Sequence, residues 1–394
     1  MRHPVDLAEF ADREIVANPL GDSSFESCPM HFMTDRPTMI RRDFVKLCTG
    51  IAGGLGVSGL LSRSAAADDL AVETGSPLDD SYLEKGLNAL ARAHNMSSMA
   101  GHLGASLIAG YFIGKQRPNL DPEVFNGIKD DLGRVIGGNS VFGKKMSKRS
   151  KLTDAELFDA FPMQKPDESL IDGIAVGLEK GIDQPRQSGH NVIFASLAIR
   201  ALKDRPKFAT PAVVDGIMKL MALFQNETPG NGYYGKEKGR IYGDKIMLPD
   251  EDGTPEYDDI EGMIIAVFDE AIRLKPDTHR IGYGGLVHVI NHSAAIANLA
   301  DYGYAELVPR AIRSHRHHLR LWRNLPNVAD EKGPLRVSKF TPHTADYWTS
   351  SSIPYDRALL THRVKTMFGF DELAAAVDEE AKENAAYDKL RYMM

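Results

Sequence analysis

The stretch that decides the fold is DDSYLEKGLNALARAHNMSSMAGHLGASLIAGYFIGKQRPNLDPEVFNGIKDDL, residues 79–132. Its apolar residues recur at intervals of three and four, which predicts amphipathic helices, and long alternating runs of β-branched residues are absent. Asp121-Pro122 marks a helix start, because an N-cap residue precedes proline, and Gly137-Gly138 marks the end of that helix. The sequence therefore predicts an all-α protein.

Two later stretches follow the same order of helices. One begins at Asp167 with DESLIDGIAVGLEKG and the other at Asp258 with DDIEGMIIAVFDEAI; each continues through a linker into an Ala-rich helix and then a third helix. We predict helical repeats of about 90 residues that stack into a toroid-like ring or an open solenoid, with chance alignment of amphipathic helices as the alternative. One domain over residues 77–394 holds three units and a set of C-terminal helices: 79–136, 167–225, 258–322 and 355–390.

A histidine stands near the start of each Ala-rich helix. His102, His190 and His288 fall at matching places in the three units, and Gly-His recurs in the first two. The small residues that follow favour tight packing, so we expect these helices to be the inner ones and the histidines to line one cavity as catalytic candidates. Tyr283, five residues before His288, is a further candidate, as a proton donor, with simple aromatic packing as its alternative.

His288 and His292 are the sharpest local pair. Residues four apart lie on one face of a helix at about 6 Å, so both imidazoles can bind one metal ion. Val289 occupies the position where a zincin protease needs glutamate, so that motif is absent. We predict a site for one transition metal, Fe, Zn or Cu, on His190, His288 and His292. Metal-free acid/base catalysis and purely structural histidines remain open.

Two loops are candidate binding rims. The first, NGYYGKEKGRIYGDK, lies in an insertion that breaks the repeat, and the second is FTPHTADYWTSSSIPYD. Inserted loops on one rim of a repeat array are favoured places for binding, and aromatic rings stack on sugars; solvated surface loops are the alternative. The substrate-binding candidates are Tyr233, Tyr234, Tyr242, His343 and Trp348. We predict that the basic helix RAIRSHRHHLRLWR, residues 310–323, is solvated, with an anion-binding edge as the alternative.

Residues 39–67 resemble a twin-arginine export signal. RRDFVK carries the motif, and a 15-residue apolar run, Leu47–Leu61, and three alanines follow. The run is too short and too rich in glycine for a membrane anchor. The resemblance implies transport by the twin-arginine translocase to the periplasm or beyond, with cleavage after Ala67. The motif residues are Arg41, Arg42, Phe44 and Lys46. Residues 1–38 are predicted to be a disordered extension or to precede the true start codon.

Composition limits the partners. The net charge of −7 argues against nucleic acid as a partner. Both cysteines, Cys28 and Cys48, precede the predicted cleavage site, so the mature chain has no thiolate ligand or disulfide.

The histidine-introduced Ala-rich helices resemble those of questin-oxidase-like proteins, which are helical oxygenases; the resemblance carries no individual residue over. We expect an exported enzyme with a histidine-lined cavity that performs acid/base or oxidative chemistry on a small organic or sugar-like substrate. Oxidoreductase, lyase and hydrolase activities all remain open. The alternative is a non-catalytic repeat scaffold that binds a glycan or a protein through its rim loops.

Overall fold

The computed structural model describes residues 77–139, 150, 152–350, 359–376 and 379–393. They belong to one unit of the chain, 74–394. The predicted export signal and the extension before it lie outside the described residues. Almost every described element is a helix, which confirms the all-α prediction, and one short antiparallel hairpin, β1 (Asn231–Tyr233) with β2 (Arg240–Tyr242), is the exception.

The described α-helices and 3-10 turns follow one another along the chain. The α-helices are α2 (Asp80–Arg92), α3 (Gly101–Gln116), α4 (Pro122–Ile136), α6 (Asp172–Glu179), α7 (Arg186–Asp204), α8 (Pro211–Phe224), α9 (Ile260–Ile272), α10 (Leu286–Asp301), α11 (Val308–Arg323), α12 (Ala329–Lys332), α13 (Ala345–Thr349), α14 (Leu359–Ala376) and α15 (Glu380–Asp388). The 3-10 turns are η2 (Ala93–Asn95), η3 (Ser98–Ala100), η4 (Ala155–Phe158), η5 (Glu168–Leu170), η6 (Pro206–Phe208), η7 (Gly243–Lys245), η8 (Ala305–Leu307) and η9 (Lys389–Tyr392).

Side-chain caps explain where several helices begin. The Asp79 carboxylate accepts a hydrogen bond from the backbone N–H of Ser81 at the start of α2 (3.0 Å). Asp121 caps α4 just before its first residue, Pro122, as the sequence predicts, and the helix ends at Ile136 before the glycine pair. Each cap satisfies a backbone donor that the first turn of a helix leaves free.

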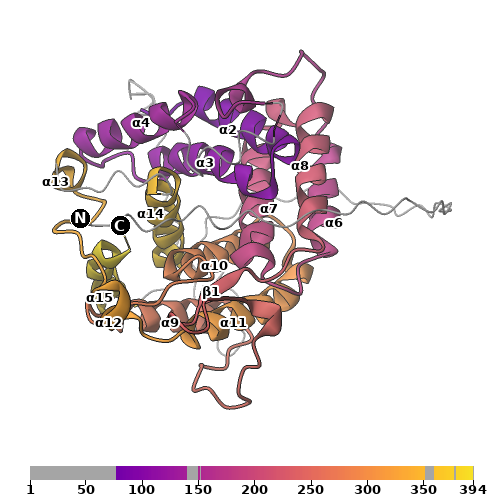
Figure 1. Ribbon diagram of the computed structural model, residues 1–394. Coiled ribbons are helices and arrows are strands. Elements are labelled where there is room, and N and C mark those ends of the chain that lie inside the picture. Colours follow the sequence, from indigo (N-terminus) through magenta and orange to yellow (C-terminus); the bar gives the residue numbers. More distant parts are fainter. Residues whose placement is uncertain (1–76, 140–149, 151, 351–358, 377–378, 394) are drawn as a thin grey trace, which may run out of the picture. The chain divides into compact units, whose positions relative to one another are not determined.

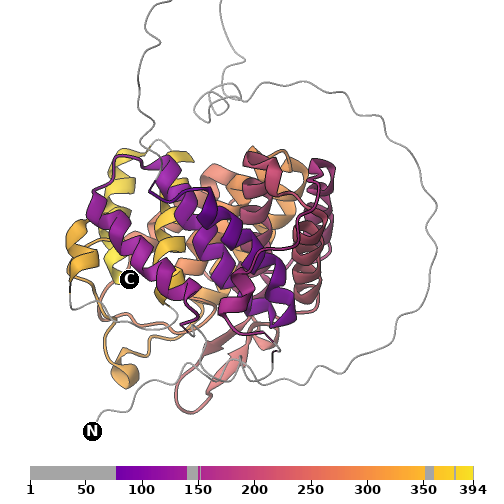
Figure 2. The ribbon, with the colours of Figure 1, turned by 90° about the horizontal axis from the view of Figure 1, so that it is seen from above.

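Four helices form the interior: α3, α7, α10 and α14. Nearly every residue of these helices is buried, whatever side of the helix it lies on, which is the pattern of helices surrounded by other helices. In packing order α3 contacts α7, α7 contacts α10, α10 contacts α14, and α14 returns to α3. Figures 1 and 2 show the remaining helices arranged around these four.

The arrangement partly matches the predicted repeats. The Ala-rich helices α3, α7 and α10 are interior, and α2, α6, α8, α9 and α11 pack outside them. The threefold repeat and its closure into a toroid remain predictions. The C-terminal helix α14, which was assigned to no repeat, packs as a fourth interior helix.

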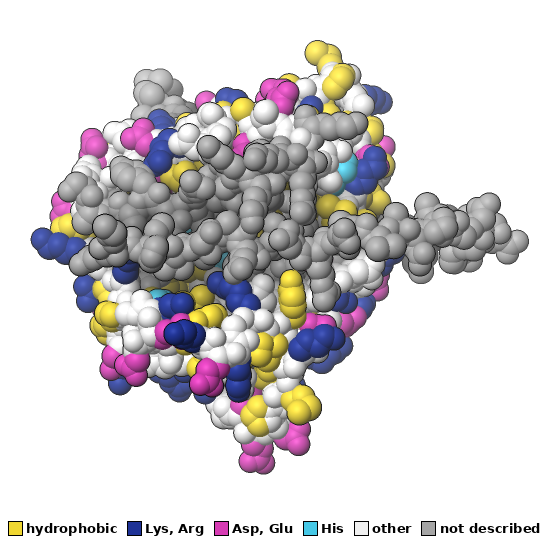
Figure 3. All heavy atoms as spheres, in the orientation of Figure 1, with side chains coloured by type: hydrophobic (Ala, Val, Ile, Leu, Met, Phe, Trp, Pro, Cys, Tyr) yellow, Lys and Arg dark blue, Asp and Glu magenta, His cyan; other side chains and the backbone are white. Residues whose placement is uncertain are grey.

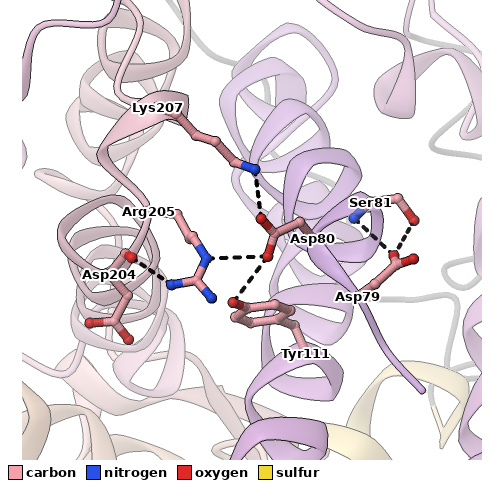
Figure 4. A network of polar contacts seen from close by, with 7 residues as sticks. All are labelled: Asp79, Asp80, Ser81, Tyr111, Asp204, Arg205 and Lys207. Atoms are coloured by element: carbon pink, nitrogen blue, oxygen red, sulfur yellow. Dashed lines mark hydrogen bonds and ion pairs between the residues drawn. The ribbon is translucent and has the colours of Figure 1, made fainter. Parts of the chain in front are cut away.

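A polar network ties the start of α2 to the end of α7 (Figure 4). The Asp80 carboxylate accepts hydrogen bonds from Lys207 (2.6 Å), Arg205 (3.2 Å) and the Tyr111 hydroxyl on α3 (3.2 Å). The Lys207 and Arg205 contacts hold the pKa of Asp80 below its usual value. These contacts join the outer helix of the first predicted unit to the inner helices of the first and second.

The exposed face in Figure 3 intersperses acidic and basic side chains and carries no broad field of one sign on its described part. Among the described helices, none is both long enough and apolar enough to cross a membrane.

Candidate metal centre

Four histidines converge in the interior, and each stands near the start of a different central helix. His102 lies on α3, His190 on α7, His288 on α10 and His362 on α14. The Nε2 atoms of His102 and His190 are 2.9 Å apart, those of His190 and His288 are 3.0 Å apart, and those of His288 and His362 are 3.2 Å apart. We call these four residues the histidine ring.

The four imidazoles form a cycle rather than a tetrahedron. Ring centroids of neighbours are separated by 4.3 Å for His102–His190, 4.7 Å for His190–His288, 4.8 Å for His288–His362 and 4.9 Å for His102–His362. The pair across the cycle, His102–His288, is separated by 6.0 Å. The order of the imidazoles therefore follows the packing order of their helices.

Backbone carbonyls determine which nitrogen of each imidazole carries a hydrogen. Nδ1 of His102 contacts the Met99 carbonyl oxygen (2.9 Å), and Nδ1 of His288 contacts that of Gly284 (2.5 Å). The Gln187 carbonyl contacts Nδ1 of His190 in the same way. A carbonyl only accepts hydrogen bonds, so each Nδ1 donates and a neutral ring directs its Nε2 lone pair at the other imidazoles.

Burial keeps these imidazoles neutral. His102, His190 and His288 have exposed fractions of 1, 2 and 5 %. Burial lowers the pKa of all three well below the usual value, and the nearby Lys365 and the neighbouring imidazoles lower it further. Lone pairs that face one another are repulsive unless a cation lies between them.

The cluster has the composition and spacing of a metal site. Among the described residues, His102, His288 and His362 form a group whose ligand atoms come close enough to share an ion, all within 4.8 Å. These three residues could hold a metal ion. His190 also contacts both His102 and His288.

A left-handed turn positions His190. Gln187 and Ser188 have φ of 47° and 63°, and Gly189 has φ of 84°. The left-handed conformation costs a non-glycine residue about 1–2 kcal/mol. The turn is held in place by the Gln187 N–H, which donates to the Thr228 carbonyl (2.8 Å). Backbone strain that the surroundings hold in place is typical of functional sites.

A second such turn positions His288. Tyr283 has φ of 47°, and Gly284 has φ of 72°. A Cβ atom on Gly284 would lie 2.2 Å from Cγ of His288, so only glycine fits beside this imidazole. The Tyr283 N–H donates to the carbonyl of Asn231 in β1 (2.9 Å).

The inserted loop with the β1–β2 hairpin therefore supports the ring. Its Thr228 and Asn231 carbonyls hold the two turns that precede His190 and His288. Binding of a substrate by this loop remains a prediction. Its Tyr233 hydroxyl donates to Glu331, while the Tyr234 hydroxyl lies 3.2 Å from that of Tyr283.

The other predicted residues lie in several places. Tyr283 is 1 % exposed and its hydroxyl contacts Tyr234, not the ring. Tyr242 ends β2 and is half-buried. His343 contacts Asp371 (2.8 Å), and the Trp348 indole N–H donates to the Pro342 carbonyl (2.6 Å).

His292 belongs to a second histidine cluster. Its Nδ1 lies 3.4 Å from Nδ1 of His318, and its ring centroid lies 5.2 Å from that of His315. His315 and His318 are fully buried on α11, so the prediction of a solvated helix was wrong for these residues. They are three residues apart and share the inward face of α11. Backbone carbonyls of Val289 and Tyr283 accept from their Nε2–H groups (3.1 and 2.9 Å).

His362 was not predicted, because no Gly-His pair or strained turn marks it in the sequence. Its one available signal was position: it stands near the start of a buried helix, 74 residues after His288. Comparison of the chain with protein-family models, with curated proteins and with solved structures gives no match.

Proposed function

We propose that the protein binds one transition-metal ion through the Nε2 atoms of His102, His190, His288 and His362 and uses it in oxidative chemistry. The observation that carries this proposal is the convergence of the Nε2 atoms. Carbonyl contacts at Nδ1 of the first three residues hold their lone pairs toward the centre. This second-sphere arrangement is the usual one for metal-binding histidine.

The nitrogen separations suit a metal ion. Metal–imidazole bonds are about 2.0–2.1 Å long, which places neighbouring nitrogens about 2.9 Å apart at a right angle and about 3.4 Å apart in a tetrahedron. The observed separations of 2.9, 3.0 and 3.2 Å lie between these limits. The cyclic order, with the longer His102–His288 separation across it, favours a tetragonal ion such as Cu(II), or iron, over tetrahedral zinc.

The surroundings favour redox chemistry over hydrolysis. The ligands are neutral imidazoles. No carboxylate of the described chain joins them to act as the general base for a metal-bound water. Copper or iron bound here would supply one-electron chemistry. This chain's own residues hold the ion, fix the imidazole tautomers and keep bulk water away. Export by the twin-arginine route, which carries folded proteins, is part of the same proposal.

The test is metal analysis of residues 68–394, purified without chelators or a histidine tag. We expect near one Cu or Fe per chain, and loss of that metal in His288→Ala. His292→Ala is the matched control, because His292 is equally buried, one turn further along α10, and faces the second cluster. The control should retain its metal.

Two results would overturn the proposal. One is a folded protein that neither contains nor takes up a stoichiometric transition metal. The other is metal loss in His292→Ala as complete as in His288→Ala, which would move the site to the pair of histidines four residues apart. Circular dichroism of each variant separates loss of ligand from loss of fold.

A further inference from the structure

A small cavity lies directly beneath the histidine ring, between α7, α10 and α14. Ile193, Asn291 and Lys365 line it, and each is three residues after a ring histidine on its own helix. Its free volume is about 10 Å³, the space that one water molecule or small ion needs. The cavity is thus one helical turn below the ring and inside the protein.

Three polar side chains that line this cavity make no hydrogen bond or ion pair within the described chain. The Ser196 hydroxyl is buried and makes no hydrogen bond. Lys365 is 2 % exposed and Asn291 is 5 % exposed, and neither has a hydrogen bond or ion pair with another described residue. Nζ of Lys365 lies 5.9 Å from the centroid of the Phe194 ring, and burial without an opposite charge lowers the pKa of Lys365 well below its usual value. Buried polar groups are nearly always paired, and a buried ammonium is costly unless an opposite charge compensates it.

All three side chains are able to donate hydrogen bonds: an amino group, a hydroxyl and an amide. No carboxylate lines the cavity, and the rest of its wall consists of the apolar residues Ile193, Leu197, Ala294, Ala295 and Phe368 together with Asn298 and Gly369. A ligand that accepts from these donors and keeps the buried Lys365 protonated carries negative charge, and in so small a space it has very few atoms. Oxyanions and carboxylates are too large.

We infer that this cavity binds a monatomic anion of the halide class, held by Lys365, Ser196 and Asn291. The anion compensates the buried ammonium group and the charge of an ion in the ring above it. The site depends on its own three donors, so the inference extends beyond the proposed function and does not require it.

Crystals of the mature protein grown with bromide in place of chloride test the inference. We expect an anomalous scattering peak within hydrogen-bond distance of Lys365 Nζ and Ser196 Oγ. Lys365→Met keeps the length of the side chain and removes its charge. One charge-assisted hydrogen bond contributes about 1.5–3 kcal/mol, so this variant should bind bromide at least about tenfold more weakly.

Ser196→Ala provides a second variant and should lower bromide occupancy less. Lys219→Met is the control, since Lys219 is exposed and pairs with Asp215 (2.6 Å); its bromide peak should equal that of the unchanged protein. In solution, chloride should raise Tm in the unchanged protein and in Lys219→Met, and should not raise it in Lys365→Met.

A water molecule in the cavity at saturating bromide, or an undiminished bromide peak in Lys365→Met, would overturn the inference. Metal content, measured on the same samples, separates this result from the proposed function. Bromide without metal would support the anion site alone, and metal without bromide would support the metal centre alone.

Discussion

Acid should destabilise the metal-free protein in the pH range where histidines titrate and few other side chains do. Burial lowers the pKa of the half-buried His317 and of six histidines that are 5 % exposed or less: His102, His190, His288, His292, His315 and His318. The values reach about 3 for His315 and about 4 for His318. The folded state therefore holds these imidazoles neutral, whereas the unfolded chain protonates them below about pH 6.5. The stability that these neutral imidazoles contribute is fully present above that pH and is lost as the pH falls below it.

The size of the effect follows from proton linkage. Between pH 7 and 5.5, a histidine that stays neutral only when folded lowers the free energy of unfolding by about 1.3 kcal/mol, so six lower it by about 8 kcal/mol. Asp131 acts in the opposite direction, because burial raises its pKa to about 6 despite its contact with Arg363. It offsets a little under 1 kcal/mol. The net loss in the free energy of unfolding is therefore comparable to the whole stability of an ordinary domain, about 5–15 kcal/mol.

The assay is urea unfolding of the metal-free mature protein in steps from pH 7.5 to 5. The slope of the unfolding free energy against pH counts the protons taken up, and we expect about five at pH 5.5. His318→Gln should lower this count by about one. Saturating metal should shift the loss of stability to lower pH, because it binds the neutral imidazoles of the folded state. An uptake of one proton or fewer at pH 5.5 would refute the buried, neutral state of the histidines.

The remaining predictions concern one strained turn and one buried ion pair. Gly189→Ala should cost about 2 kcal/mol or more in urea unfolding and weaken metal binding, since Gly189 has φ of 84° and the new Cβ would lie 2.7 Å from Cγ of His292. Gly133→Ala is the control, because Gly133 lies on the exposed face of α4 and no atom lies within 4 Å of the new Cβ. It should raise the free energy of unfolding by about 0.5–1 kcal/mol. Equal losses of stability in Gly189→Ala and Gly133→Ala would contradict this account. Glu372→Gln should lower the free energy of unfolding by about 3–5 kcal/mol, because it leaves the buried Arg200 without the carboxylate that lies 2.9 Å from its Nη1. The double variant Arg200→Met, Glu372→Leu removes both charges and should recover most of that loss. A double variant as unstable as Glu372→Gln would count against this account.

Much of the fold could be predicted from the sequence, because it depends on local physical chemistry. Helical periodicity and the caps at Asp79 and Asp121 depend on neighbouring residues alone, and the structure has both helix starts. Small, apolar residues around the whole circumference of the Ala-rich helices predict interior positions. His102, His190 and His288, placed near the starts of these helices, were predicted to share one cavity, and their imidazoles do meet in the interior.

Tertiary packing decided the rest of the site. His288 and His292 share a helix face in sequence terms, yet the rotation of α10 between its neighbours directs one imidazole into the ring and the other toward α11. His362 joins the ring because α14 packs between α3 and α10, a contact between segments far apart in the chain. The hairpin loop supports the turns before His190 and His288 through backbone hydrogen bonds that side-chain identity does not reveal. Local sequence therefore determined where the helices are and which residues they carry, whereas the packing of whole helices determined which imidazoles face one another.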